Sequence, residues 1–426
     1  MRTNKIIEAI HEGRLDERLN EIYADPYIIP YEKKRYEQAL YQYNATFGAD
    51  EVEIFSAPGR SEIGGNHTDH QHGEVLAASI NRDAIAIVKN LNRPRVTILS
   101  DGYTSEIKVD IDDLDKRKSE EGTTAALIRG VLAKIQINGY SIGGFQAYIT
   151  SDVLIGAGLS SSAAFETLIG TIVSYLYNNN EISAVEIAKI GQYAENVYFG
   201  KPCGLMDQMA CSVGSLVHIN FADVKRPKIE QVQLDLDAHG YSLCITDTKG
   251  SHADLTPDYA AIPQEMKQVA EFFGKEVLGQ VSKQDILRDI PQIREKAGDR
   301  AFLRAIHFMN ENERVQQEAE ALKQDHFSEF LELVKESGNS SYKYLQNVYT
   351  SRYIRHQNLS VALAVSDMVL GKQGASRVHG GGFAGTIQAF VPENMVEDYR
   401  EAMEDIFGEG TCQVLKIRKY GGVKVL

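Results

Sequence analysis

The spacing of apolar residues divides the chain into an N-terminal helical segment and a longer part of mixed character. In residues 1–50, apolar side chains recur near helical spacing: Ile6, Ile7, Ile10, Leu15, Leu19 and Ile22. From residue 51 the pattern alternates as in strands, over 52–60, 75–90 and 95–101. Helical spacing returns over 124–135, 160–177 and 183–200, with a stripe in steps of four: Ala164, Leu168, Ile172 and Leu176. A strand is predicted before the second of these helices, over 143–161.

A second mixture of elements follows residue 225. We expect strands at 240–248 and after the glycine-rich turn within 376–392, helices over roughly 262–345 and 359–371, and a final strand or hairpin at 412–426. Strands and helices interleave without a regular βαβ period, which favours an α+β fold over a doubly wound parallel sheet. A chain of 426 residues is long for one core. We therefore predict a helical extension (1–50), an N-terminal domain (51–225) and a C-terminal domain (226–426).

Charge and composition narrow the class of protein. The chain carries 45 basic and 59 acidic residues, a net charge of −14, whereas nucleic-acid binders usually present a basic face. No apolar run approaches the ~18 residues of a membrane span, and the charged N-terminus does not resemble a signal peptide. The four cysteines form no CxxC pair. We expect a cytoplasmic protein with reduced thiols that binds neither nucleic acid nor membranes.

The stretch GAGLSSSAA, residues 156–164, has the composition of a phosphate-binding turn. Gly156 and Gly158 allow backbone N–H groups to approach an anion, and the helix that follows points its N-terminal N–H groups at the same place. An ordinary helix cap after a tight turn would look the same. The chain lacks the Walker pattern G-x4-G-K-[ST], so any nucleotide is held without a P-loop lysine.

Two further stretches are ambiguous when taken alone. In GKPCGLMDQMACSVG, residues 200–214, Asp207 stands among apolar and small residues, where a carboxylate needs partners to stay ionised. A helix-capping or salt-bridged aspartate would satisfy the same pattern. HGGGFAGT, residues 379–386, places four glycines ahead of a strand, which suits either a binding loop or a close packing point.

The stretch GGNHTDHQHG, residues 64–73, gathers three histidines and one aspartate. Such a cluster is typical of a zinc site, with His67, His70 and His72 as ligands. It is equally suited to a polyol, because aspartate accepts hydroxyl hydrogen bonds and histidine can donate or accept one. The residues of this stretch leave both readings open.

Taken together and in order, PGRSEIGGNHTDH, GAGLSSSAA, PCGLMDQ and GGGFAGT resemble the motifs of the galactokinases within the GHMP small-molecule kinase superfamily. The family patterns are roughly P-G-R-x-N-L-I-G-E-H-T-D-Y, G-L-S-S-S-A, P-C-G-x-M-D-Q and G-G-G-F-G-G. The resemblance spans about residues 51–426. It implies the two-domain GHMP kinase fold with the active site in the cleft between domains, and it favours a sugar loop over a zinc site.

The resemblance also implies an activity: transfer of phosphate from ATP, with Mg²⁺, to the anomeric hydroxyl of a sugar. Asp207 matches the residue that takes or orients the hydroxyl proton, and Arg60 the cation beside it. The glycine loop, 380–385, is expected to close over the site. The remaining matches are sugar contacts at Asn66, His67, Asp69, Gly204 and Tyr259, phosphate contacts at Gly156, Gly158, Leu159, Ser160, Ser161 and Ser162, and Mg²⁺ ligands at Ser162 and Glu195.

The first motif departs from the family pattern on its sugar side. Glu62 replaces Asn, Gly64 replaces Ile, Asn66 replaces a Glu that contacts the sugar's outer hydroxyl, and His70 replaces Tyr. An amide at 66 loses the charge-assisted part of a hydroxyl hydrogen bond, on the order of 1 kcal/mol. No aromatic residue that would stack on adenine is evident.

Several functions are compatible with this pattern. The leading hypothesis is a galactokinase. A related kinase acting on N-acetylgalactosamine, arabinose or another hexose would share the mechanism. A sensor that binds galactose and ATP without turnover would share the fold, but Arg60, Asp207 and the serines of the phosphate turn are all in place, which favours an enzyme. A metal-dependent hydrolase would instead need zinc bound by the three histidines.

Overall fold

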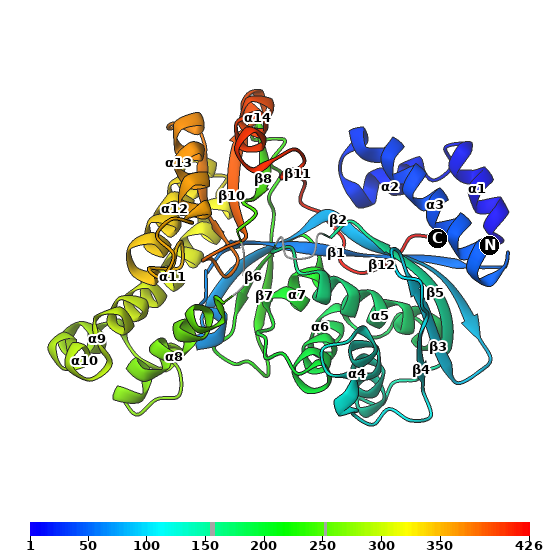
Figure 1. Cartoon of the computed structure of the whole chain (residues 1–426), viewed down its shortest axis with the longest axis horizontal. Coiled ribbons are helices and arrows are strands. Elements are labelled where there is room, and N and C mark those ends of the chain that lie inside the picture. Colours follow the sequence, from blue (N-terminus) through cyan, green and yellow to red (C-terminus); the bar gives the residue numbers. More distant parts are fainter. Residues whose placement is uncertain (154–157, 251–253) are drawn as a thin grey trace.

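The computed structural model describes residues 1–153, 158–250 and 254–426 (Figure 1). In these residues the strands form two sheets. The larger has the order β12-β1-β2-β5-β3-β4, with β6 on β2 and β7 on β6, and the smaller has the order β11-β8-β10-β9. Among the described residues, all paired strands of both sheets are antiparallel except β3 with β5, which are parallel. The predicted α+β class is confirmed, and a doubly wound parallel sheet is excluded.

The strands of the larger sheet are β1 (Glu53–Gly64), β2 (Glu74–Leu91), β3 (Arg95–Ser100), β4 (Ile107–Asp110), β5 (Gly144–Ser151), β6 (Leu216–Asn220), β7 (Lys228–Val232) and β12 (Val423–Lys424). Those of the smaller sheet are β8 (Tyr241–Asp247), β9 (Ala375–His379), β10 (Thr386–Pro392) and β11 (Cys412–Leu415).

Helices cover both faces of the larger sheet (Figure 1). On one face lie α4 (Thr124–Ile137), α5 (Ser161–Asn178), α6 (Ala184–Tyr193) and α7 (Met206–Val213), and on the other α1 (Thr3–His11), α2 (Asp16–Tyr23) and α3 (Ile29–Phe47). The remaining helices accompany the smaller sheet: α8 (Thr256–Phe272), α9 (Lys283–Arg288), α10 (Ile290–Ala297), α11 (Asp299–Lys323), α12 (Phe327–Ser340), α13 (Asn358–Leu370) and α14 (Val396–Phe407). The helical prediction for residues 1–50 is confirmed.

Strand β2 explains why the N-terminal helices are part of the fold. Ala84, Ala86 and Val88 pack into the core beneath α4–α6, while Ile85 and Ile87 pack on the opposite face against α1–α3. Alternate side chains of a strand point to opposite faces, so a stretch that is apolar at every position, as 84–88 is, needs cover on both faces. The N-terminal segment supplies the second cover.

Helix α5 holds the predicted stripe of apolar residues. Ala164, Leu168 and Ile172 have no exposed surface, and Leu176, near the end of the helix, is half-buried. The next predicted helix, 183–200, is divided. Its cap is as expected, with Ser183 accepting a hydrogen bond from Glu186 N at 3.2 Å, but regular helix ends at Tyr193 and a π-turn follows, η4 (Ala194–Phe199).

The C-terminal segment enters both sheets, so of the two alternatives predicted for 412–426 the hairpin is wrong, while strands do form there. Strand β11 pairs with β8 in the smaller sheet, and β12 pairs with β1 in the larger one. Between them the chain passes close to α7, where a side chain at Gly421 would overlap the carbonyl of Ser212. The two termini therefore lie near each other (Figure 1). Strand β7 pairs with β6 and β12 pairs with β1, so segments after residue 225 also belong to the larger sheet. A domain boundary at 225 stays a prediction.

Candidate active site

Both predicted catalytic residues and four of the five predicted sugar contacts line one small cavity of about 220 Å³. Its walls come from β1, from the loop after β1, from the loop before α7 with α7 itself, and from the glycine loop between β9 and β10. The lining residues are Arg60, Glu62, Asn66, His67, Asp69, His70, Lys201, Pro202, Cys203, Gly204, Met206, Asp207, Gly380 and Gly381. The volume lies below the ~300–1,000 Å³ of drug-sized ligand sites. A small polar ligand fits its size and chemistry.

Asp207, in the first turn of α7, is held between a cation and a hydroxyl. Arg60 Nε and Nη2 lie 2.8 and 2.7 Å from Asp207 Oδ1, and Ser160 Oγ donates to Oδ2 at 2.6 Å. Burial alone would raise the pKa of Asp207, but the charge of Arg60 and the Ser160 hydrogen bond outweigh it and hold the pKa below its usual range. The carboxylate is therefore ionised. It lines the cavity, where it can accept a hydrogen bond from a ligand hydroxyl.

The turn before α5 lies beside this pair. Gly158 has φ +67°, and an added Cβ would lie 3.1 Å from Thr386 Oγ1, so a side chain is both strained and crowded there. Arg60 Nη1 donates to the carbonyl of Gly158. Ser160 takes the left-handed conformation, φ 59°, and α5 begins at Ser161. The N-terminal N–H groups of an 18-residue helix thus open beside Asp207, where an anion is favoured. Gly156 lies outside the described residues.

Ser162 and Glu195 come together as predicted. Ser162 Oγ donates to Glu195 Oε1 at 3.2 Å, and Lys201 Nζ lies 3.2 Å from the same oxygen. The other carboxylate oxygen accepts a 2.9 Å hydrogen bond from Gln208 Nε2, which also donates to Glu166 at 3.1 Å. Two oxygen ligands suit Mg²⁺, which is commonly held by one or two protein groups together with water and substrate phosphates.

The loop after β1 presents His67 and Asp69 to the cavity. Burial lowers the pKa of His67 to about 4, so its ring is neutral at neutral pH. His67 Nε2 donates to the carbonyl of Gly381 at 3.0 Å. Asp69 Oδ1 accepts from the backbone N–H of His70 at 2.9 Å, and any side chain at Gly204 would overlap Asp69 Oδ2. Glycine at 204 thus lets the loop before α7 approach the aspartate in the position that Asp69 takes here.

The histidine cluster does not form one centre. His67 contacts Gly381, as above, whereas His70 Nε2 lies 3.7 Å from Asp69 and the His70 side chain is 42% exposed. Over residues 1–153, 158–250 and 254–426, no group of three or more His, Cys, Asp or Glu side chains is placed to hold a metal ion.

Tyr259, on α8, contacts the glycine loop and does not line the cavity. Its hydroxyl donates to Gly382 O at 2.7 Å, and its ring packs edge-on against Phe383 with centroids 5.3 Å apart. A Cβ at Gly381 would come within 2.8 Å of the Tyr259 ring. Tyr259 therefore packs against the glycine loop and does not itself line the cavity.

Sequence reasoning missed three residues at the site. Lys201 beside Glu195, Gln208 between two carboxylates, and Glu62 in the cavity wall were not assigned roles, although all three stand inside or next to the motifs. Lys201 directly precedes PCGLMDQ and Gln208 is the last residue of that motif, which is the signal that could have marked them. For Glu62 the signal was a carboxylate two residues after Arg60 on the same strand, since such residues share a face.

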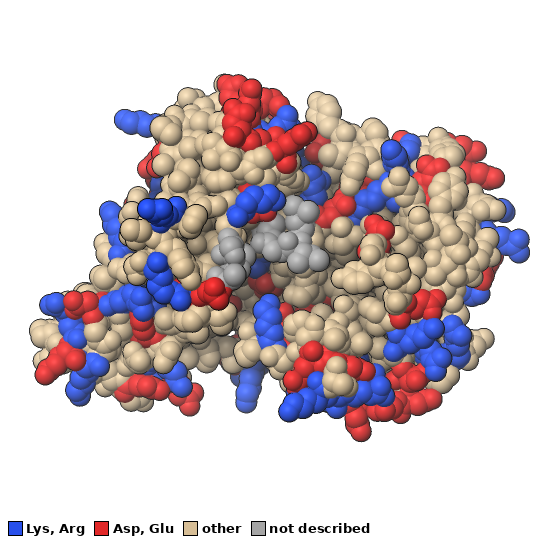
Figure 2. Space-filling view, viewed as in Figure 1, with Lys and Arg blue, Asp and Glu red and all other residues tan. Residues whose placement is uncertain are grey.

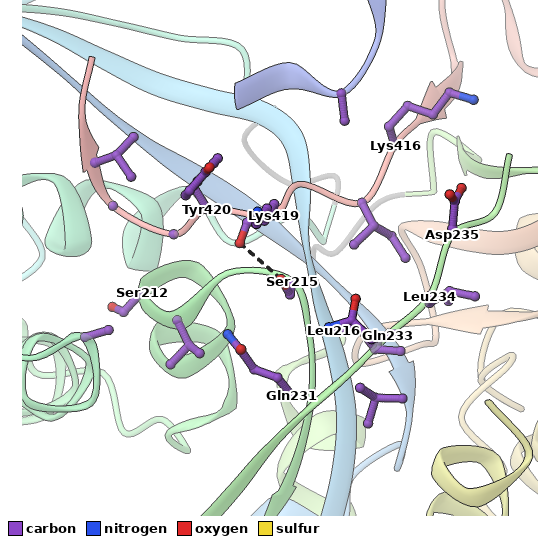
Figure 3. Close-up of a pocket in the computed structure, with 18 of the residues that line it drawn as sticks. Ser212, Ser215, Leu216, Gln231, Gln233, Leu234, Asp235, Lys416, Lys419 and Tyr420 are labelled. Carbon is purple, nitrogen blue, oxygen red and sulfur yellow. Dashed lines mark hydrogen bonds between the residues drawn. The ribbon is translucent and has the colours of Figure 1, made fainter. Parts of the chain in front are cut away.

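A larger hollow, about 820 Å³, lies elsewhere and contains none of the predicted site residues. Figure 3 shows its walls, which are formed by the segment 231–237 and the C-terminal segment. A 3.1 Å hydrogen bond from Ser215 Oγ to Lys419 O joins the C-terminal segment to the start of β6.

Over the molecular face of Figure 2, Lys and Arg are interspersed with Asp and Glu. Of the described helices, none has the length and apolar character needed to span a membrane.

Comparison with known proteins gives matches over nearly the whole chain. The model for the GHMP kinases N terminal domain matches residues 126–215, and the galactokinase galactose-binding signature matches residues 41–90. The galactokinase of Glaesserella parasuis serovar 5 (strain SH0165) is 30% identical over 378 residues, which cover 87% of this chain and 93% of the relative. That of Actinobacillus pleuropneumoniae serotype 5b (strain L20) is 29% identical, with 88% and 94% covered.

Solved structures share the fold. Lactococcus lactis galactokinase complexed with galactose superposes with a TM-score of 0.76 at 24% identity, over 90% of this chain and 98% of that one. A mevalonate kinase superposes with a TM-score of 0.60 at 15% identity, over 85% and 99%. The GHMP kinase fold expected from the motifs is confirmed, and the identity to curated relatives over most of their length places this chain in the galactokinase family.

Proposed function

We propose that this protein is a galactokinase, which transfers the γ-phosphoryl group of ATP to the anomeric hydroxyl of galactose. The observation that carries the proposal is the ionised carboxylate of Asp207, fixed by Arg60 and Ser160 at the wall of a small cavity whose other walls include His67 and Asp69. Membership of the galactokinase family implies ATP as the phosphoryl donor.

In this mechanism the anomeric hydroxyl lies against Asp207. The carboxylate orients the hydroxyl and accepts its proton as the new oxygen–phosphorus bond forms and the bond between the γ-phosphorus and the β–γ bridging oxygen breaks, releasing ADP. Arg60 keeps Asp207 ionised and offers positive charge to the phosphoryl oxygens. Such reactions depend on positioning and charge stabilisation, with little covalent work for the protein.

The other assignments follow the geometry of the site. His67 and Asp69 are proposed to bind sugar hydroxyls, with Gly204 allowing the close approach of its loop. The turn from Gly158 to Ser162 and the start of α5 would hold the ATP phosphates. Mg²⁺ fits the oxygen pair of Ser162 and Glu195, where it would neutralise phosphate charge. Tyr259 is proposed to act on the sugar through the glycine loop.

The function is tested by measuring ADP release from MgATP with galactose, N-acetylgalactosamine, glucose and arabinose as acceptors. Turnover that is fastest on galactose is the expected result. Turnover that is fastest on another sugar would keep the mechanism and change the substrate. Binding of galactose and ATP without ADP release would make the protein a sensor, and ATP-independent activity with bound zinc would make it a hydrolase.

The proposed metal site yields a separate prediction. Replacing Glu195 by Gln removes the charged ligand, so the Mg²⁺ concentration for half-maximal rate should rise about tenfold or more. The measurement is the initial rate as a function of free Mg²⁺ at saturating sugar and ATP. Glu181→Gln, at an exposed carboxylate before α6, is the matched control and should leave the Mg²⁺ dependence unchanged. A wild-type Mg²⁺ dependence in Glu195→Gln would remove Glu195 from the site.

A further inference from the structure

The side chain of Asn66 is already committed to protein partners. Its Nδ2 donates two hydrogen bonds, to Glu62 Oε1 at 2.8 Å and to Gly380 O at 2.7 Å. Its Oδ1 accepts from Asn347 Nδ2 at 2.8 Å. The residue has no exposed surface. Because an amide nitrogen has only two hydrogens, Asn66 has no donor left for a sugar, and its acceptor faces Asn347.

Glu62 has the opposite character. Its Oε1 accepts from Asn66 and, at 2.8 Å, from Arg377 Nη2, but its Oε2 accepts no hydrogen bond from the described residues. Glu62 is 4% exposed and lines the active-site cavity. Its Oε2, although without a hydrogen-bond partner among the described residues, is not fully buried. The small exposed surface of Glu62 therefore opens into the cavity.

Neighbouring residues hold this carboxylate rigidly. Arg377, on β9, has no exposed surface, and besides Glu62 it donates to Ile63 O at 2.7 Å. Together Arg377 and Asn66 fix Oε1 from two directions, which sets the position of Oε2. A binding group fixed in this way loses little conformational entropy when a ligand arrives.

We propose that Glu62 is the specificity-determining carboxylate of this site: its Oε2 accepts a hydrogen bond from a sugar hydroxyl other than the one that receives phosphate, while Asn66 acts as a positioning residue for Glu62. The inference rests on the proposed function for its ligand class. A buried carboxylate with one unpartnered oxygen in a cavity wall is best satisfied by a hydroxyl donor, because a charge-assisted hydrogen bond replaces the water that the ligand displaces. In the motif that the chain resembles, the amide stands at 62 and the carboxylate at 66, so the two groups have exchanged places here.

The test crosses variants with substrates. Glu62→Gln should raise KM and the dissociation constant for galactose about tenfold, with kcat changed less than threefold, because a contact made equally in ground and transition states is lost. With the 2-, 3-, 4- and 6-deoxygalactoses, wild type and variant should bind one analogue equally well, namely the one that lacks the hydroxyl contacted by Glu62. Calorimetric binding is measured beside turnover.

Two further variants separate binding from support. Glu62→Asp keeps a charge for Arg377 but withdraws it from the cavity, so it should show the same selective loss and carries the test if Glu62→Gln does not fold. Asn66→Ala, which acts through Glu62, should show the same selectivity with a smaller loss: the analogue that Glu62→Gln binds as well as wild type should again bind equally well. A uniform loss across the sugars in both Glu62 variants would overturn the proposal, as would selectivity for one hydroxyl that depends on Asn66 and not on Glu62.

The outcome for the proposed function can be read separately. If the wild type binds galactose in the hydroxyl-dependent way described but releases no ADP, the kinase fails and the role of Glu62 stands. If galactose is phosphorylated but no deoxy analogue distinguishes Glu62→Gln from wild type, the kinase stands and the role of Glu62 falls. If no sugar binds, both are overturned.

Discussion

Replacing Asp207 by Asn should lower kcat for sugar phosphorylation about 10³-fold while sugar affinity changes less than threefold. The amide keeps the shape of the carboxylate and can still contact a hydroxyl, but it cannot accept the proton, and general-base catalysis commonly contributes about 10²–10⁴-fold. Steady-state ADP release gives kcat, and calorimetry gives the sugar dissociation constant. Asp223→Asn, at an exposed loop residue, is the control and should match wild type. A decrease in kcat of less than tenfold would show that Asp207 is not the proton acceptor.

The same carboxylate sets the acid side of the pH profile. The ionised form is required, so activity is present above the pKa of Asp207 and is lost as pH falls through it. Since Arg60 and Ser160 hold this pKa below its usual range, the loss in wild type should lie below about pH 3.9. In Arg60→Met the raising effect of burial is no longer opposed by a cation, and the loss should move to higher pH. A profile that did not move would mean that Arg60 does not hold Asp207 ionised.

The sequence predicted the parts of this protein that local patterns encode. The alternation in β2, the apolar stripe of α5 and the helices of residues 1–50 all reflect burial, which spacing reports directly. Arg60, His67 and Asp69 from the first motif and Asp207 from the third line one cavity, as the resemblance of these motifs to a known family implied. In this sense the fold class and most of the candidate site could be predicted from the chain alone.

What could not be predicted depends on partners distant in sequence. The exchange of hydrogen-bonding roles between Glu62 and Asn66 depends on Arg377 and Asn347, about 280 to 315 positions away. The position of Tyr259 behind the glycine loop depends on the contact of its ring with Gly381. The separation of β11 from β12 into two sheets depends on pairing with β8 and β1, which no pattern within 412–426 specifies.

The N-terminal extension is another such case, because its attachment is polar as well as apolar. Asp83, on β2, has no exposed surface and joins three parts of the chain. From α3, Arg35 donates to Asp83 Oδ1 at 2.7 Å, and from α2, Tyr23 donates to Oδ2 at 2.9 Å. From the C-terminal segment, Arg418 Nη1 lies 3.0 Å from Oδ2. Although burial would raise the pKa of Asp83, the two arginines hold it below its usual range, so the carboxylate is charged.

Replacing Asp83 by Asn should therefore lower the free energy of unfolding by about 3–5 kcal/mol, because Arg35 and Arg418 would remain buried without a full counter-charge. Denaturant unfolding followed by circular dichroism measures the change. The matched control is Asp110→Asn, which breaks an Asp–Arg pair of the same 2.7 Å length between Asp110 and Arg95, both about half exposed, and should leave the free energy of unfolding nearly unchanged. Equal losses in the two variants would mean that the buried cluster contributes no more than a surface pair. A loss of unfolding free energy in Asp83→Asn but not in Asp110→Asn would show that one carboxylate joins the extension and the C-terminal segment to the kinase core. The apolar pattern of β2 predicted cover on both faces of that strand, but it could not predict this polar attachment.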